Sequence, residues 1–505
     1  MPGRFLLPLP LLLACGDGGR VPREKGDESW LAGVSLLSEE PLHEGDPSVT
    51  LRRYELGPAP GRDLQAPDGE RPRFWVIQAA ARPALPGPLL LLLHGGSLDV
   101  ETDREPIGRY GRCTSAYTAD LTRRLAVGTA LVDLFVAEGG VVVIPEDAGC
   151  DGWVGMGPLD PVDPHHLGFA VAEAAVGFVQ AGGADGETEG LVVGGGSRGA
   201  GGSVWFAAHH PGVQALLFDS GLPDLIREHE DAAYNDEDLA YRQACLEHVM
   251  GDAPFVAGDS TAPSAAWSRY EDWSLMRTLQ GGGWTVPVFH IWNTQDLLSP
   301  ASANDELVMA LDESGLRHHS WNTDHGAPLH GQIPDRDQRG PAWAALRFLR
   351  GDTLHRFEAE EADGDDLIGQ VEGGDRAPRG ASQQSVRSAV PADGAGVLVR
   401  WSLPTTDIGA NARLFVALEG ESRAEPSATV ARLRVEDADG GVVAEQSLVA
   451  ESLPPTLGGD SVKNAAAIEA ATLSYVGGDA PLWATVEVVG NANLRVDTML
   501  LAVEP

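Results

Sequence analysis

The chain has 505 residues, which is too long for a single hydrophobic core and indicates at least two folded domains. Hydrophobic residues make up 43% of the sequence and charged residues 22%, which is typical of globular and not of disordered proteins. The formal net charge of −38 argues against nucleic acid or anionic lipid headgroups as partners, because both would repel such a surface.

The first fifteen residues predict an export signal. One early positive charge, Arg4, precedes an apolar run that is too short to cross a bilayer as a helix. The run ends in Leu-Leu-Ala-Cys at residues 12–15, which resembles the lipobox of bacterial lipoproteins, although Leu13 is less usual. The resemblance implies that Cys15 is lipidated and becomes the mature N-terminus; ordinary cleavage nearby is the alternative. Residues 16–30 follow as a glycine-rich, charged tether.

These features predict an exported bacterial lipoprotein at the cell envelope, bound to the membrane through its lipid anchor only. Exported proteins form disulfides, and Cys113 and Cys150 flank one predicted helix and strand, which makes them the favoured pair over Cys245. The cysteines do not have the spacing of a metal site. Adjacent side chains point in different directions, so the histidine pairs are not expected to bind metal either, and neither a metal nor a cofactor is predicted. The pairs are His165-His166, His209-His210 and His318-His319.

Strand and helix patterns alternate between residues 31 and 351. Strands with helical crossovers between them predict a doubly wound, mainly parallel sheet, in which ligands bind at the carboxyl ends of the strands. The run of leucines from Leu89 is typical of a central strand covered on both faces. The expected strands begin near residues 73, 89, 141, 191, 215, 286 and 316, and the expected helices near residues 114, 169, 203 and 342.

Residues 195–199 read Gly-Gly-Ser-Arg-Gly, the G-x-S-x-G pattern of a serine on a sharp strand-to-helix turn. With 62 glycines in the chain the pattern alone is weak, because it arises easily by chance. The context of the pattern favours a nucleophile turn over a chance match, because an apolar strand precedes it and a helical pattern follows it. Ser197 is therefore the predicted nucleophile.

This region resembles the α/β-hydrolase fold, in which the nucleophile, the acid and the base follow one another in that order along the chain. Asp296 lies in a loop after a late strand, followed by apolar residues and a proline, as in the family. His325 lies just beyond the last expected strand, where the family places its general base. The resemblance implies a triad of Ser197, Asp296 and His325, in which the histidine takes the serine proton and the carboxylate orients the histidine.

An oxyanion hole is implied by His-Gly-Gly-Ser at residues 94–97, after the leucine strand. The expected donors are the main-chain N–H groups of Gly96 or Ser97 and of Arg198. His94 itself is expected to be structural.

Other residues compete for the acid and base roles. Asp219 follows the strand after Ser197, a position that some hydrolases use for the acid. Asp324 adjoins the histidine, but neighbouring side chains diverge, so it is a poor orienter. His330 is a weak substitute for His325.

Residues 222–283 form a long insertion that resembles a lid over the site. Its aromatic residues either line a substrate pocket or form the core of the lid itself, and helical spacing favours the core. They are Tyr234, Tyr241, Trp267, Tyr270 and Trp273.

After residue 351 the pattern changes. An acidic linker is expected over residues 352–370, followed by an all-β sandwich domain over residues 371–505 with short alternating strands and turn residues. The domain resembles the carbohydrate-binding or jelly-roll modules of secreted hydrolases. Glycan or partner binding and a purely stabilising role both remain open.

Together these features predict an exported serine hydrolase that cleaves a carboxylic ester, small or glycan-linked, through an acyl-enzyme on Ser197. One alternative is a prolyl-oligopeptidase-like peptidase, although the usual propeller does not fit into the residues before 74. The other is a non-catalytic surface binding lipoprotein with a hydrolase-like fold.

Overall fold

A computed structural model describes most of the chain, and the statements below concern the described residues. These are residues 31–59, 64, 70–81, 87–95, 115–146, 167–184, 188–233, 239–294, 296, 298–322, 339–358, 369–373, 384–388, 396–404, 412–422, 424–450, 466–469, 482–489 and 492–504.

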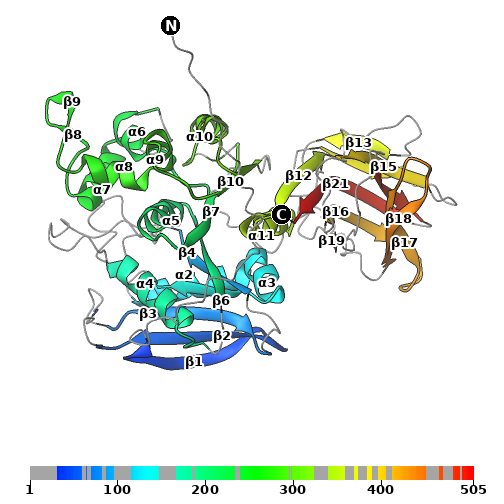
Figure 1. Cartoon of the computed structure of the whole chain (residues 1–505), viewed down its shortest axis with the longest axis horizontal. Helices are drawn as coiled ribbons and strands as arrows, with labels where there is room; N and C mark the ends of the chain where they lie inside the picture. The colour runs from blue at the N-terminus through cyan, green and yellow to red at the C-terminus, as the bar shows by residue number, and fades with distance from the viewer. Residues whose placement is uncertain are drawn as a thin grey trace, which may run out of the picture.

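A nine-stranded sheet forms the centre of the N-terminal part of the molecule (Figure 1). Neighbouring strands from β5 to β11 run parallel, whereas β1, β2, β3 and β5 pair antiparallel at the other edge. This confirms the predicted mainly parallel sheet. In spatial order the strands are β1 (Val34–His43), β2 (Asp46–Leu56), β3 (Arg73–Ala79), β5 (Val141–Pro145), β4 (Gly87–Leu93), β6 (Thr188–Gly196), β7 (Val213–Asp219), β10 (Val288–Trp292) and β11 (His318–Asn322).

The sequence did not predict the β1–β2 hairpin. β1 is an edge strand and most of its side chains are exposed, so it lacks the continuous apolar run that marks the central strands.

Helices cover both faces of the sheet, as the leucine strand requires. In β4, Leu89, Leu91 and Leu93 face one hydrophobic cluster, while Leu90 and Leu92 face another, and all five are fully buried. The segment expected as one long helix after residue 114 forms two. The helices around the sheet are α2 (Ser115–Gly128), α3 (Ala130–Ala137), α4 (Leu167–Gln180), α5 (Arg198–His209), α10 (Ala301–Ser314) and α11 (Arg339–Leu349).

An insertion between β7 and β10 carries four helices and a small hairpin within the described residues. Two of its aromatic residues, Tyr270 and Trp273, are buried, and Trp273 packs near Phe169 and Trp205 of the sheet-covering helices. These two side chains are therefore part of the core, and their burial removes them as free pocket walls. The elements are α6 (Leu225–Glu230), α7 (Leu239–Met250), β8 (Phe255–Val256), β9 (Asp259–Pro263), α8 (Trp267–Trp273) and α9 (Leu275–Gln280).

The C-terminal part is β-rich and contains two sheets whose buried side chains form one hydrophobic cluster. Strand alternation there was read correctly for several strands, including Gly396–Leu403. The six-stranded sheet has β13 (Gly369–Gly373), β14 (Gln384–Ser388), β21 (Ala492–Val503), β16 (Ala412–Ser422) and β19 (Ala466–Glu469), with β12 (Thr353–Glu358) paired to β21. The four-stranded sheet has β15 (Gly396–Leu403), β20 (Leu482–Val488), β17 (Thr429–Glu436) and β18 (Val442–Val449).

β12 lies in the segment expected as an acidic linker over residues 352–370. It forms a strand because Leu354 and Phe357 pack against two different hydrophobic clusters while its backbone pairs with β21. That pairing partner is about 140 residues away along the chain, so a local reading of composition does not reveal the strand.

Helix α11 connects the two parts (Figure 1). Trp343 of α11 is buried and stacks on Phe415 of β16, with ring centroids 5.3 Å apart. Among the described helices, none is long and apolar enough to cross a membrane.

Candidate active site

Ser197 lies between the end of β6 and the start of α5, on the strand-to-helix turn that the sequence predicted. Its backbone has φ +55° and ψ −123°, a conformation that is unfavourable for a residue with a side chain. Its N–H donates to the main-chain oxygen of Asp219 on the adjacent strand at 2.8 Å. Such a strained turn raises the serine side chain at the carboxyl end of the sheet, where a nucleophile is needed.

The outer glycines of the motif are required by close backbone contacts. A Cβ on Gly195 would lie 2.1 Å from the main-chain oxygen of Gly199, and a Cβ on Gly199 would lie 2.3 Å from that of Leu93. Both distances are far below van der Waals contact. The two outer glycines of the motif are therefore required for α5 to pack against β6 and β4.

The start of the expected oxyanion loop lies directly against Ser197. A Cβ on Gly95 would lie 3.3 Å from the Cβ of Ser197, so only the main chain separates the end of β4 from the nucleophile. His94 is buried, and its Nδ1 is 2.9 Å from the main-chain oxygen of Gly95, consistent with a structural role. Arg198 is the first residue of α5, so its N–H lies at the positive end of the helix dipole. Gly96 and Ser97 lie outside the described residues.

Asp296 follows β10 and is buried, with 3% of its surface exposed. Its Oδ1 accepts the main-chain N–H groups of Leu298 at 2.9 Å and Ser299 at 3.0 Å. Two such donors fix the carboxylate and stabilise its negative charge. The predicted base His325 lies outside the described residues, as do Asp324 and His330, so the contact between acid and base remains a prediction.

A buried hydrogen-bond network that the sequence analysis missed supports the Asp296 loop. The Asn304 amide of α10 donates to the main-chain oxygens of Ser299 and Pro300, at 2.9 and 3.0 Å, and lies 3.1 Å from the Ser299 hydroxyl. Its Oδ1 is 2.9 Å from His290 Nε2, so that nitrogen must be the donor. His290 lies in the middle of the apolar strand β10, and this buried polar residue was the one sign of the network in the sequence.

His290 is neutral in this network. Burial lowers its pKa to about 4, and the hydrogen bond that its Nε2 donates to Asn304 Oδ1 opposes that shift only in part. A charged imidazole at this site would need a carboxylate partner, whereas the neutral ring satisfies Asn304 with its single N–H.

Asp219, the alternative acid, is fully buried at the end of β7 and pairs in register with Gly196, the residue before Ser197. The next residue, Ser220, also has a positive φ of 47°, and its N–H donates to the main-chain oxygen of Ile291 at 2.8 Å. Both non-glycine residues with positive φ in the described part of the chain therefore lie at the carboxyl ends of neighbouring strands. Backbone strain of this kind often clusters at functional sites, which supports a site at the carboxyl ends of β6 and β7.

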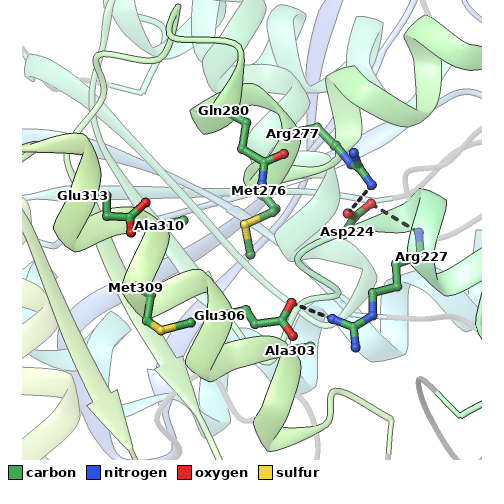
Figure 2. Close-up of a pocket in the computed structure, with 10 residues that line it drawn as sticks. All are labelled: Asp224, Arg227, Met276, Arg277, Gln280, Ala303, Glu306, Met309, Ala310 and Glu313. Atoms are coloured by element: carbon green, nitrogen blue, oxygen red, sulfur yellow. Dashed lines mark hydrogen bonds and ion pairs between the residues drawn. The ribbon is translucent and has the colours of Figure 1, made fainter.

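A separate pocket of about 270 Å³ lies between the insertion and α10 (Figure 2). Figure 2 shows two ion pairs on one side of it, Asp224 with Arg277 at 2.8 Å and Arg227 with Glu306 at 2.5 Å. Neither Ser197 nor Asp296 is among the described residues that line this pocket. The lining residues are Asp224, Arg227, Met276, Arg277, Gln280, Ala303, Glu306, Met309, Ala310 and Glu313.

The remaining sequence predictions about cysteine are not covered by the structure. Cys15, Cys113 and Cys150 lie outside the described residues, and Cys245 lies on α7 with its side chain not described. Within the described part of the chain, no group of three or more His, Cys, Asp or Glu residues is arranged to hold a metal ion.

Comparison with known proteins finds no matching family model and no matching curated protein. Among solved structures, the chain is similar to a Mycobacterium tuberculosis puromycin-hydrolyzing peptidase, with 18% identity, a TM-score of 0.35, and coverage of 56% of this chain and 37% of that one. It is also similar to a Rhizomucor miehei esterase structure, with 12% identity, a TM-score of 0.38, and coverage of 61% and 84%. For esterase B of Lactobacillus rhamnosis the identity is 13%, the TM-score 0.36, and the coverage 63% and 85%.

The chain spans less than half the length of the first of these, the mycobacterial peptidase. The three similarities include both esterases and a peptidase, and at this level they leave the substrate undecided. The fold itself follows from the sheet order and from the turn at Ser197. The mainly parallel sheet and the strained strand-to-helix turn at Ser197 are the features of the nucleophile elbow in the α/β-hydrolase fold.

Proposed function

We propose that this protein is a serine hydrolase that cleaves a carboxylic ester through an acyl-enzyme on Ser197. The observation that carries the proposal is the strained turn at Ser197, with the start of the oxyanion loop against its side chain. Strain of this kind is unfavourable by about 1–3 kcal/mol and persists only where the surrounding structure enforces it. In the proposed reaction His325 takes the serine proton, and Asp296 holds the imidazole in the correct tautomer.

An ester substrate is favoured over a peptide by the demands of the leaving group. An amine must be protonated as it departs, so a peptidase must hold the scissile bond accurately beside the imidazole. An alcohol is a better leaving group than an amine, so ester cleavage depends less on that protonation and on accurate placement. A peptidase related to the prolyl oligopeptidases remains the second candidate, since the same triad order serves both reactions.

The experiment compares hydrolysis of short-chain p-nitrophenyl esters and p-nitroanilides by the wild-type chain and by Ser197→Ala. We expect ester hydrolysis to dominate in kcat/KM, and Ser197→Ala to lose both that activity and labelling by an active-site phosphonate. Ser203→Ala is the matched control, because Ser203 is a buried serine on α5 whose hydroxyl already donates to the main-chain oxygen of Ala200. Labelling that persists in Ser197→Ala would place the nucleophile elsewhere, and a preferred anilide would favour the peptidase.

The location and the accessory region are proposals as well. The Leu-Leu-Ala-Cys sequence at residues 12–15 supports export and lipid anchoring at Cys15. The two C-terminal sheets with a shared hydrophobic cluster support a β-sandwich accessory domain.

A further inference from the structure

Asp219 connects the two described parts of the candidate active site. It is the last residue of β7, and its main-chain oxygen accepts the N–H of Ser197 at 2.8 Å. The loop of Asp296 is joined to the same segment, because the Ser299 hydroxyl donates to the main-chain oxygen of Gly221 at 2.6 Å. The main chain of residues 219–221 therefore holds both the Ser197 turn and the Asp296 loop, and a displacement of this segment would reach both.

The carboxyl group of Asp219 has few partners. The residue is 0% exposed, and its Oδ1 accepts the Ser220 hydroxyl at 3.0 Å. Its Oδ2 is buried and has no hydrogen-bond partner in the described part of the chain. Among the described residues, the charged group that acts on the Asp219 carboxyl group is Asp296, which is also a carboxyl group.

Asp219 and Asp296 therefore differ in the charge that their surroundings favour. Asp296 accepts two main-chain N–H groups, which stabilise a carboxylate. Asp219 has a single hydroxyl donor in a fully buried position, and an ion there would be strongly unfavourable. A protonated carboxyl group is the form that such a site accepts.

We propose that Asp219 is a neutral carboxylic acid whose buried side chain keeps residues 219–221 in place, and with them the Ser197 turn and the Asp296 loop, while Asp296 alone supplies the negative charge. The proposal rests on the proposed function for its catalytic consequence. Its statement about protonation concerns the folded chain itself and is testable without activity.

The titration of Asp219 agrees with this assignment. Burial raises the pKa of Asp219 to about 8, and the nearby Asp296 acts in the same direction, against the Ser220 hydrogen bond. His290 on the neighbouring strand pairs in register with Phe218, and burial lowers its pKa to about 4, so it contributes no charge. Ionisation of Asp219 above about pH 8 would place a second negative charge beside Asp296.

The same shift predicts how stability depends on pH. An aspartic acid in the unfolded chain loses its proton at about pH 4, whereas Asp219 in the folded protein keeps its proton up to about pH 8. Between these values the folded state binds the extra proton, so this residue makes stability fall as the pH rises. The amide of Asp219→Asn does not titrate, so in this variant residue 219 no longer contributes to the fall of stability with rising pH.

The first test measures thermal unfolding of the full chain and of Asp219→Asn at about pH 5 and about pH 8. We expect the fall in Tm between the two pH values to be smaller in Asp219→Asn by about 5 °C or more. Asp305→Asn, an exposed carboxyl group on α10, is the matched control and should follow the wild type. Equal falls in the wild type and Asp219→Asn would overturn the proposal.

The second test measures ester hydrolysis. Asp219→Ala should lower kcat at least about tenfold, and Asp219→Asn should restore it to within about threefold without the loss above about pH 8, because the amide keeps the shape of the neutral acid. Asp296→Asn should lower kcat about 10⁴-fold, as expected for the charged residue that orients the histidine.

An Asp219→Asn variant as inactive as Asp296→Asn would make Asp219 the charged member and overturn the proposal. Absence of hydrolysis and of phosphonate labelling in the wild type would refute the proposed function, and the Tm comparison would still decide the protonation of Asp219.

Discussion

At the scale of single residues, Asn304 shows how a side chain outside the predicted triad supports the loop of Asp296, the candidate acid. Its amide donates to the loop after Asp296, and its oxygen accepts the His290 N–H, so one side chain closes the loop against β10. All three groups are buried. Polar groups in such a network are costly to leave unpaired, which makes the network rigid as long as it is complete.

We predict that Asn304→Leu lowers the free energy of unfolding by about 2 kcal/mol, because it leaves His290 Nε2 and the Ser299 main-chain oxygen buried without partners. Ester kcat should fall at least about tenfold as the Asp296 loop loosens. Chemical denaturation and steady-state kinetics measure the two effects. Asp305→Asn on the exposed side of the same helix should change neither, and a fully active Asn304→Leu would remove Asn304 from the support of the site.

At the scale of elements, α11 carries a buried charge cluster where the two parts of the molecule meet. Arg347 is 2% exposed and pairs with Asp352 and with Glu138, the residue that ends α3. Arg413 of the β-rich part also pairs with Glu138, at 3.3 Å. The cluster therefore joins elements that are far apart in the chain.

Arg347→Met should destabilise the protein by about 3–5 kcal/mol, since the buried Asp352 would lose the cation that pairs with it, while the half-buried Glu138 would keep Arg350 and Arg413. Arg350→Met is the matched control. Arg350 pairs with the same Glu138 at 3.3 Å but is 30% exposed, and its loss should cost less than about 1 kcal/mol. Urea unfolding of the two variants measures the difference, and similar values for both would contradict the buried role of Arg347.

At the scale of the whole molecule, the proposed attachment to the membrane depends on one residue. The net charge of −38 gives the protein no electrostatic attraction to anionic lipids, so the lipid on Cys15 must supply the affinity. We predict that the mature chain fractionates with membranes and carries the mass of acyl groups, and that Cys15→Ser is released into the soluble fraction. Cys245→Ser should stay with the membranes. A soluble wild-type chain with an unmodified Cys15 would refute the anchor.

Features that depend on local sterics and on continuous apolar runs were predictable from the sequence. The turn at Ser197 was found because its outer glycines meet main-chain atoms that tolerate no Cβ, and a steric need of this kind leaves a mark in the sequence. The leucine strand was found because a strand covered on both faces has no polar alternation. The position of Asp296 after a late strand followed from the resemblance to the hydrolase fold.

Strands without a continuous apolar run were decided only by the tertiary structure. The edge strand β1 is mostly exposed, and β12 is a strand because it pairs with the distant β21, so the composition of each left little local signal. The neutral state expected for Asp219 also depends on the tertiary structure, since its complete burial and the neighbouring Asp296 come from other segments of the chain. The sequence alone indicated two candidate carboxyl groups, Asp219 and Asp296. Only their surroundings in the fold indicate which of the two is suited to carry a negative charge.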